Sequence, residues 1–314
     1  MRNLPKVQKK RQLMGAQPKY RIYPSLLDKY QDLLDYETIA EEDWNKVSET
    51  ALERGEFKGC DAGDYKLTPD EMYLKLEAEL IDTINRCPRK PNEAADKGTA
   101  FNEIVDCLIE GRGSSREDCK IYSCYNKGGL NAIKIIRAEI NGFVFDYDVK
   151  LCKETAKAFD GAVTQYLTSA VMETAFGSVE IYGFIDEWVG NRMVDIKTTG
   201  KYSFGKYEKK WQRHAYPWCA IESGDAEEIE SFTYWVLEWA YQRQGDPLKA
   251  KSITEETYTY DHQNTSLLLR QHVESLIGWL EYRKEFIQDK RIFGGENPEG
   301  WHGTPVDPAL LEHQ

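Results

Sequence analysis

Apolar residues recur at helical spacing in several long stretches of the chain, with capping residues at their ends. Residues 68–87 are the clearest example, because Thr68 is a candidate N-cap and Glu71 follows three positions later, as in a capping box. Further helices are predicted over residues 23–44, 98–111, 152–176, 207–223 and 264–290. The candidate end residues of these helices are Ser25, Gly111 and Asn264.

Stretches between these helices alternate in polarity, as strands do. Residues 132–151 surround Asn141-Gly142, a dipeptide typical of a type I′ hairpin turn. Residues 183–200 form a second pair of strands around Gly190-Asn191. Residues 231–241 and 251–260 are predicted to be further strands. Because helices come before, between and after the hairpins, the pattern predicts an α/β fold with a mixed central β-sheet flanked by helices.

The turn of the second hairpin determines which of its residues face each other. If Val189 pairs with Arg192, then Asp186 stands directly opposite Asp195. Directly opposed side chains have Cβ atoms roughly 4.5–5.5 Å apart, and like charges at that distance destabilise a strand pair. The register therefore predicts two carboxylates forced together.

Lys197 lies two residues beyond Asp195 and emerges on the same face of the strand, whereas Val194 and Ile196 point into the core. Two carboxylates beside one ammonium group form a site that a divalent cation such as Mg²⁺ stabilises. This hairpin is thus a candidate metal site.

The pattern D-x-K also occurs at three other places, Asp64/Lys66, Asp118/Lys120 and Asp148/Lys150. In the hairpin around Asn141-Gly142, counting outward from the turn pairs Asp146 with Arg137, which is an ordinary cross-strand ion pair. The first two copies lie in polar stretches without an opposed acid. Only the copy at Asp195 has a carboxylate opposite it.

The charge of the chain is acidic overall but uneven. The net charge of −12 argues against a protein that coats nucleic acid, because phosphate affinity comes mostly from Lys and Arg. Residues 1–20 nevertheless contain basic side chains and no acidic one, and residues 197–213 hold a second basic cluster. Local basic strips on an acidic protein suit an enzyme that acts on a polyanion; the alternative is a basic tail and one solvated helix face.

The chain has no apolar run long enough for a membrane span and no signal-peptide pattern, so we expect a cytoplasmic protein without membrane contact. Its seven cysteines form no C-x-x-C pair, and we expect reduced thiols.

Several short motifs, taken in order, resemble the PD-(D/E)xK nuclease superfamily, and within it the RecB-type and phage lambda-type exonuclease branch. The stretch IYGFID gives the G-x-x-D motif at Gly183 and Asp186, and MVDIKT gives D-x-K-T. The helix carrying QRHAY matches Q-x-x-x-Y through Gln212 and Tyr216, which are neighbours on one helix face. Upstream, S-x-L-x-x-Y is matched by Ser25, Leu27 and Tyr30. The similarity covers most of residues 22–240.

The resemblance implies a restriction-endonuclease-like core and a set of site residues. Asp186, Asp195 and Lys197 would be catalytic. Mg²⁺ or Mn²⁺ would be held by Asp186, Asp195 and the Ile196 carbonyl. The residues expected at DNA are Thr198, Lys209, Lys210, Gln212, Arg213 and Tyr216. For the aromatic residues Tyr207, Trp211 and Trp218, packing against the sheet is preferred over stacking on bases.

The chain departs from the family pattern at two points. The first core helix of the family usually reads G-x-x-x-H, with the histidine as a metal ligand, but Gly98 is followed here by Asn102. Glu103 is the favoured replacement ligand and Asp106 the alternative; both are equally compatible with ordinary surface carboxylates. No cysteine follows Cys219, so we expect no iron–sulfur cluster of the kind that some relatives hold.

The expected function is that of a Mg²⁺-dependent DNA exonuclease of phage-type recombination or DNA repair. Its partners would be DNA with a free end and a single-strand-annealing or recombination protein, and some relatives form rings. A silent nucleic-acid-binding protein and a structure-specific or restriction-type endonuclease are the alternatives. The expected organisation is a mobile basic tail over 1–20, one nuclease domain over 21–293 with an inserted hairpin near 130–150, and an extended tail over 294–314.

Overall fold

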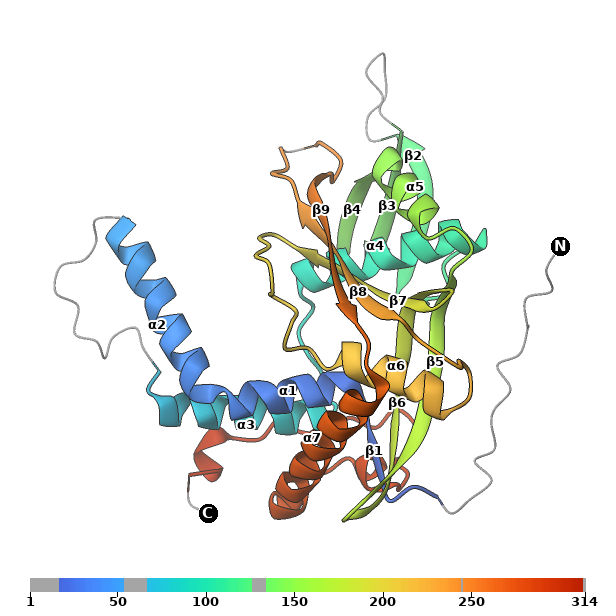
Figure 1. Cartoon of the computed structure of the whole chain (residues 1–314). Helices are drawn as coiled ribbons and strands as arrows, with labels where there is room; N and C mark the ends of the chain where they lie inside the picture. Colours follow the sequence, from blue (N-terminus) through green and yellow to red (C-terminus); the bar gives the residue numbers. More distant parts are fainter. Residues whose placement is uncertain (1–16, 54–66, 126–133, 244, 313–314) are drawn as a thin grey trace.

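The computed structural model describes residues 17–53, 67–125, 134–243 and 245–312, although not the side chains of 45–53 (Figure 1). Most of the basic N-terminal tail, and the D-x-K copy at Asp64/Lys66, lie outside the described residues. No described helix is both long and apolar enough to cross a membrane.

The centre of the molecule is a mixed six-stranded sheet built around one long strand, β6. Its strands are β1 (Tyr20–Ile22), β5 (Val163–Thr174), β6 (Gly177–Val189), β7 (Arg192–Thr199), β8 (Ser231–Trp239) and β9 (Ala250–Thr259). One edge of β6 pairs with β5 along its length. The other edge pairs first with β1, in parallel, and then with β7, antiparallel. The predicted α/β class and mixed sheet are confirmed.

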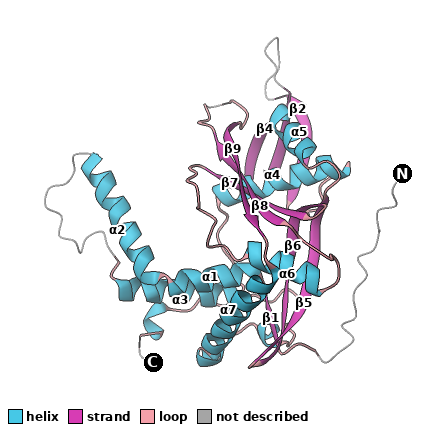
Figure 2. Ribbon diagram, viewed as in Figure 1, coloured by secondary structure: helices cyan, strands magenta, loops and turns pink. Residues whose placement is uncertain are grey.

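Helices cover one face of the sheet and gather at its β1 end. These are α1 (Pro24–Leu34), α3 (Pro69–Ile84), α6 (Gln212–Glu222) and α7 (His262–Tyr282). Apolar residues of α1, α3, α6 and α7 form one core with β1 and the first half of β6. Figure 2 shows α1, α3 and α7 at this end of the sheet and α2 (Tyr36–Glu53) extending away from it.

The other face of β7 and β8 packs against α4 (Glu93–Glu110) and a second, three-stranded sheet. That sheet consists of β2 (Cys119–Tyr125), β3 (Lys134–Ile140) and β4 (Phe143–Asp148), and α5 (Val149–Ala158) follows it. Val194 and Ile196 of β7 are buried in this second core. The predicted hairpin at Asn141-Gly142 therefore belongs to a sheet that helps to bury α4.

The register predicted for the hairpin at Asn141-Gly142 is confirmed. That of the second hairpin holds from its turn as far as the pair Glu187/Val194, but the expected pair of Asp186 with Asp195 is not part of the ladder. Arg137 pairs with Asp146, and their side chains form an ion pair with Arg137 Nη2 2.8 Å from Asp146 Oδ2. Val189 pairs with Arg192, as expected for a two-residue turn at Gly190-Asn191.

The capping residues predicted from the sequence are confirmed at some helix ends and wrong at others. Thr68 and Glu71 form the predicted capping box, and Gly111 ends α4 with a left-handed φ of 64°. The predicted cap at Ser25 is wrong, because α1 begins at Pro24. At α7, the capping side chain belongs to Asp261, which accepts a hydrogen bond from the N–H of Asn264.

The predicted helix over 152–176 is wrong in its second half. The helix ends at Ala158, and Val163–Thr174 is the strand β5. Buried Thr168, Ala170 and Met172 alternate there with exposed or half-buried residues that include Leu167 and Val171. Because apolar side chains occupy both rows, the alternation that marks a strand is hidden.

The described residues after α7 form three short 3₁₀ turns, η1 (Lys284–Phe286), η2 (Lys290–Phe293) and η3 (Pro308–Leu310). They do not stand apart from the domain. The Val306 N–H donates to Asp82 Oδ1 at 2.9 Å, and Leu311 is buried against α3. The final segment therefore packs against the helices.

Candidate active site

The two strands of the hairpin β6–β7 stop pairing where their carboxylates, Asp186 and Asp195, begin. The last ladder pair is Glu187 with Val194, one position before Asp186 and Asp195. Beyond it, the N–H of Ile196 donates to Asp186 Oδ2 at 3.1 Å. The Asp186 side chain thus occupies the place where a backbone acceptor would continue the ladder.

Strand β5 carries a matching irregularity that sequence reasoning missed. Gln165 has φ +46° and no partner in the β5–β6 ladder, and its Nε2 lies 3.4 Å from Asp186 Oδ1. A left-handed φ is strained for a residue with a side chain, and such strain is common at functional sites. A glutamine in an ordinary strand gives no sequence signal of this role.

Asp195, Lys197 and Gln212 form a closed triangle of contacts. Lys197 Nζ lies 2.6 Å from Asp195 Oδ2 and donates to Gln212 Oε1 at 2.8 Å. Gln212 Nε2 donates to Asp195 Oδ1 at 3.0 Å, and lies 3.5 Å from the hydroxyl of Tyr216. The D-x-K and Q-x-x-x-Y motifs therefore meet in one cluster.

The glycines of the two other motifs make close backbone approaches to this cluster possible. A Cβ on Gly183 would lie 2.7 Å from Cε1 of Tyr216. A Cβ on Gly98 would lie 2.6 Å from Oγ1 of Thr198. Thr198 therefore packs against α4. In each case the missing Cβ of a glycine leaves room for a side chain from another motif.

Helix α4 brings Asn102 and Asp106, but not Glu103, to the cluster. Asn102 Nδ2 donates to the Ile196 carbonyl at 3.3 Å, and its buried Oδ1 has no partner among the described residues. Asp106 is almost fully buried, and its Oδ1 likewise has no hydrogen-bond partner within the described part of the chain. Asn102 is the residue that stands where the resemblance noted in the sequence led us to expect a histidine.

Glu103 is engaged elsewhere. Its Oε1 accepts from Arg112 Nη1 at 2.8 Å and from the N–H of Ser115 at 2.7 Å. Burial raises the pKa of Glu103, but these donors outweigh burial and hold the pKa below its usual value. The preference for Glu103 over Asp106 as the missing ligand is therefore not supported by the geometry.

Burial and mutual repulsion act on the carboxylates of the site. Burial first, and then the charge of Asp195, raise the pKa of Asp186 to about 8. Burial and then Glu103 raise the pKa of Asp106 to about 7. Burial lowers the pKa of Lys197, but Asp195 and Asp186 outweigh burial, so the net shift is upward and the ammonium form is favoured.

A fourth carboxylate was missed by sequence reasoning. Glu187 is fully buried, and neither of its carboxylate oxygens has a hydrogen-bond partner among the described residues. Burial, followed by the charges of Asp186 and Asp106, raises its pKa well above the usual value. The only sequence signal was its place next to Asp186.

These donors fit a hard cation that prefers oxygen ligands. The site offers buried carboxylates, a backbone carbonyl at Ile196 and unpartnered oxygens on Asp106 and Asn102. Within the described ranges, however, no three His, Cys, Asp or Glu side chains form a ready-made cation cage. Lys197 neutralises Asp195 instead, so a cation would share this carboxylate with Lys197 or displace it.

The basic residues expected at DNA have protein partners. Lys209 Nζ lies 2.7 Å from Asp35, the C-cap of α1, and Lys210 Nζ lies 3.8 Å from Asp32 on α1. Arg213 lies over the ring of Tyr258 at 4.4 Å from its centroid. These contacts hold the start of α6 against its surroundings, and the acidic partners offset the charge of the two lysines, whereas the ring of Tyr258 leaves the charge of Arg213 in place.

The aromatic residues near α6 pack against other parts of the protein: Tyr207 and Trp218 against the sheet, as preferred from the sequence, and Trp211 on α7. Trp211 stacks on His272 with ring centroids 3.9 Å apart, and Trp218 is buried in the core with α1 and α7. Tyr207 lies 5.4 Å from the ring of Tyr234. They hold α6 over the sheet.

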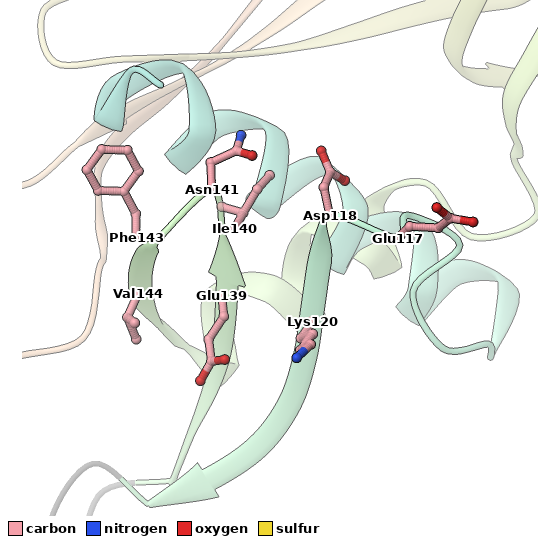
Figure 3. A pocket seen from close by; sticks show the side chains of 9 residues that line it. Glu117, Asp118, Lys120, Glu139, Ile140, Asn141, Phe143 and Val144 are labelled. Atoms are coloured by element: carbon pink, nitrogen blue, oxygen red, sulfur yellow. The ribbon is translucent and has the colours of Figure 1, made fainter. Parts of the chain in front are cut away.

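A pocket of about 290 Å³ lies at the edge of the second sheet, beside the turn at Asn141. Figure 3 shows Asp118, Lys120 and Glu139 around it. None of its lining residues belongs to the cluster around Asp195. The D-x-K copy at Asp118 therefore stands apart, and Asp118 pairs with Arg116.

Comparisons with known proteins give no family for the chain. No family model matches it, and no curated protein matches it. One solved structure, described as the crystal structure of SSO0001, is similar at 12% identity with a TM-score of 0.27. The similarity covers 39% of this chain, which spans about half (54%) of that chain.

Proposed function

We propose that this protein is a metal-dependent nuclease that hydrolyses DNA phosphodiester bonds from a strand end. We further propose that α4, α6 and strands β5–β8 form a restriction-endonuclease-like core. The observation that carries the proposal is the contact between separate motifs. Asp195 and Lys197 on β7 meet Gln212 on α6, and Asp186 on β6 accepts from the Ile196 N–H between them.

The chemistry required is attack of water on phosphorus while negative charge grows on the phosphate. Mg²⁺ or Mn²⁺, held by Asp186, Asp195 and the Ile196 carbonyl with Asp106 beside them, would activate water and shield that charge. Lys197 orients the attacking water and offsets the growing charge through its ammonium group. Gln212 holds Lys197 and Asp195 in place through its amide.

The burial of the site supports hydrolysis over simple binding. Glu187 and Asp106 are almost fully buried and carry oxygens without partners among the described residues, and burying unpaired carboxylates is costly for a protein that gains nothing from them. Sites that carry such a cost are commonly functional. The clustered acids also disfavour a phosphate unless a cation lies between them.

One observation favours a second candidate function. Asn102 stands at the histidine position, and Lys197 neutralises Asp195. A nuclease fold that has lost its metal would show such features, and would bind nucleic acid without cutting it.

Incubation of the protein with linear double-stranded DNA separates these candidates. With Mg²⁺ or Mn²⁺ we expect degradation that EDTA stops, and no cutting of closed circular DNA. Cutting of the circle would show an endonuclease instead. Binding without degradation in either metal would establish the silent nucleic-acid-binding protein.

A further inference from the structure

A strip of exposed apolar side chains leads from the carboxylates along the sheet. Leu167 of β5 and Phe184 of β6 are direct cross-strand partners, and about half of each side chain is exposed (47% and 50%). Phe184 is two residues before Asp186. Val171, also exposed, continues the row on β5. We call Leu167, Val171, Tyr182 and Phe184 the β5–β6 strip.

The strip lies on the face of β6 that α6 leaves uncovered. Gly183 and Ile181 point toward α6, since a Cβ on Gly183 would meet Tyr216 and Ile181 is buried in the core that contains Trp218. Successive side chains alternate between faces, so Tyr182 and Phe184 point the other way. Large apolar side chains on an outward row of a strand commonly mark a binding surface.

Arginines border the far end of the strip. The guanidinium of Arg21 lies over the ring of Tyr182, 5.1 Å from its centroid, and Arg86 Nη2 donates to the Tyr182 hydroxyl at 3.2 Å. Arg21 pairs with Glu180, whereas Arg86 shares Asp289 with Arg291. Three guanidinium groups thus face two carboxylates, which leaves a positive charge beside the aromatic rings.

We propose that the β5–β6 strip binds the unpaired bases of a single DNA strand whose backbone enters the site at Asp186. Aromatic faces stack on bases of any sequence, and neighbouring arginines track the phosphates. A closed duplex presents few base faces for Phe184 to stack on. The inference rests on the proposed function for its choice of DNA as ligand. It adds that the preferred substrate is single-stranded or has a single-stranded end.

The test measures binding and cleavage separately. Binding of a fluorescently labelled 15-nucleotide single strand is followed by anisotropy in EDTA, where no metal-dependent cleavage occurs. We expect Phe184→Ala to weaken binding about 5-fold or more, as loss of one stacked base requires. Phe184→Trp keeps a stacking face and should bind like the wild type, whereas Phe184→Leu should behave like Phe184→Ala.

Tyr125→Ala is the matched control, because Tyr125 is a 63% exposed aromatic residue on the second sheet. It should leave binding unchanged. With Mg²⁺, Phe184→Ala should raise KM for the single strand while kcat stays near that of the wild type. Thermal denaturation of each variant shows that the fold is retained.

Each outcome bears on one claim. If the wild type and Phe184→Ala bind the single strand equally, the proposal that the β5–β6 strip binds bases is wrong, even if the nuclease is active. Binding that depends on Phe184 in a protein without nuclease activity keeps the strip and rejects the proposed hydrolysis. If Phe184→Ala instead dissociates an oligomer in sedimentation and leaves DNA binding intact, the strip is a contact between copies of this chain and the inference is wrong.

Discussion

Gly183 lies against the ring of Tyr216, so closely that a Cβ at position 183 would come within 2.7 Å of Tyr216 Cε1. The glycine precedes Asp186 on β6, and the tyrosine follows Gln212 on α6. This contact sets how near α6 lies to the strand that carries Asp186. It therefore links the G-x-x-D and Q-x-x-x-Y motifs physically.

Gly183→Ala should lower the free energy of unfolding by about 1–3 kcal/mol, because the added methyl group overpacks a buried contact. Gly200→Ala is the matched control, since a Cβ there meets no atom within 4 Å and its φ is not left-handed. Urea denaturation of both variants measures the difference. Equal stabilities would contradict the close approach.

Asp195→Ala and Lys197→Ala should each reduce Mg²⁺-dependent DNA degradation by roughly 100-fold or more, the usual cost of losing a principal catalytic group. Lys120→Ala is the control, because Lys120 belongs to the D-x-K copy on β2, away from the site. Circular dichroism verifies that each variant is folded. Full activity in both site variants would reject the proposed hydrolysis.

Asp106→Asn should weaken cation binding by about 10-fold or more, since Asp106 Oδ1 is buried without a partner in the described structure and its charge acts on Asp186. Glu103→Gln should leave cation affinity nearly unchanged and should lower stability instead, because Glu103 binds Arg112 and Ser115. Mn²⁺ titration followed by electron paramagnetic resonance measures affinity. The reverse ranking would restore Glu103 as the ligand.

Asn102→His should increase the affinity for Mn²⁺ relative to Mg²⁺, because imidazole is a better ligand for transition metals than for Mg²⁺. Asn102 is the residue of α4 that contacts the Ile196 carbonyl. Competition between the two metals, measured by calorimetry, gives the ratio. An unchanged ratio would show that position 102 does not reach the cation.

The stability of the metal-free protein should fall as pH rises from about 4 to 8. Asp186 has a pKa of about 8 in the folded chain and 3.8 as its ordinary value, so the folded protein binds this proton more tightly than the unfolded chain. Deprotonation therefore favours unfolding across that window. Thermal denaturation in EDTA should show the decrease, on the order of 1 kcal/mol or more.

Asp186→Asn should flatten this pH dependence, because the amide does not titrate. Mg²⁺ should raise the melting temperature more at pH 8 than at pH 5, since it binds the ionised carboxylate. An increase in metal-free stability from pH 5 to 8 would contradict the assigned shift.

Local sequence patterns predicted how the strands of the site pair and which residues share a helix face. The turn at Gly190-Asn191 fixed the register of β6 and β7, because a two-residue hairpin loop allows one pairing only. The alternation of β7 fixed Val194 and Ile196 in the core. Spacing also put Gln212 and Tyr216 on one face of α6, where both reach the cluster.

The residues of other elements that join these strands depend on how distant segments pack together. Glu103 and Asp106 are both buried on α4, but the chain after α4 folds back so that Arg112 and Ser115 engage Glu103. Gln165 reaches Asp186 because β5 pairs with β6, and β5 was mistaken for a helix since its outward row carries Leu167 and Val171. Such contacts depend on packing between segments distant in sequence, and local spacing does not encode them.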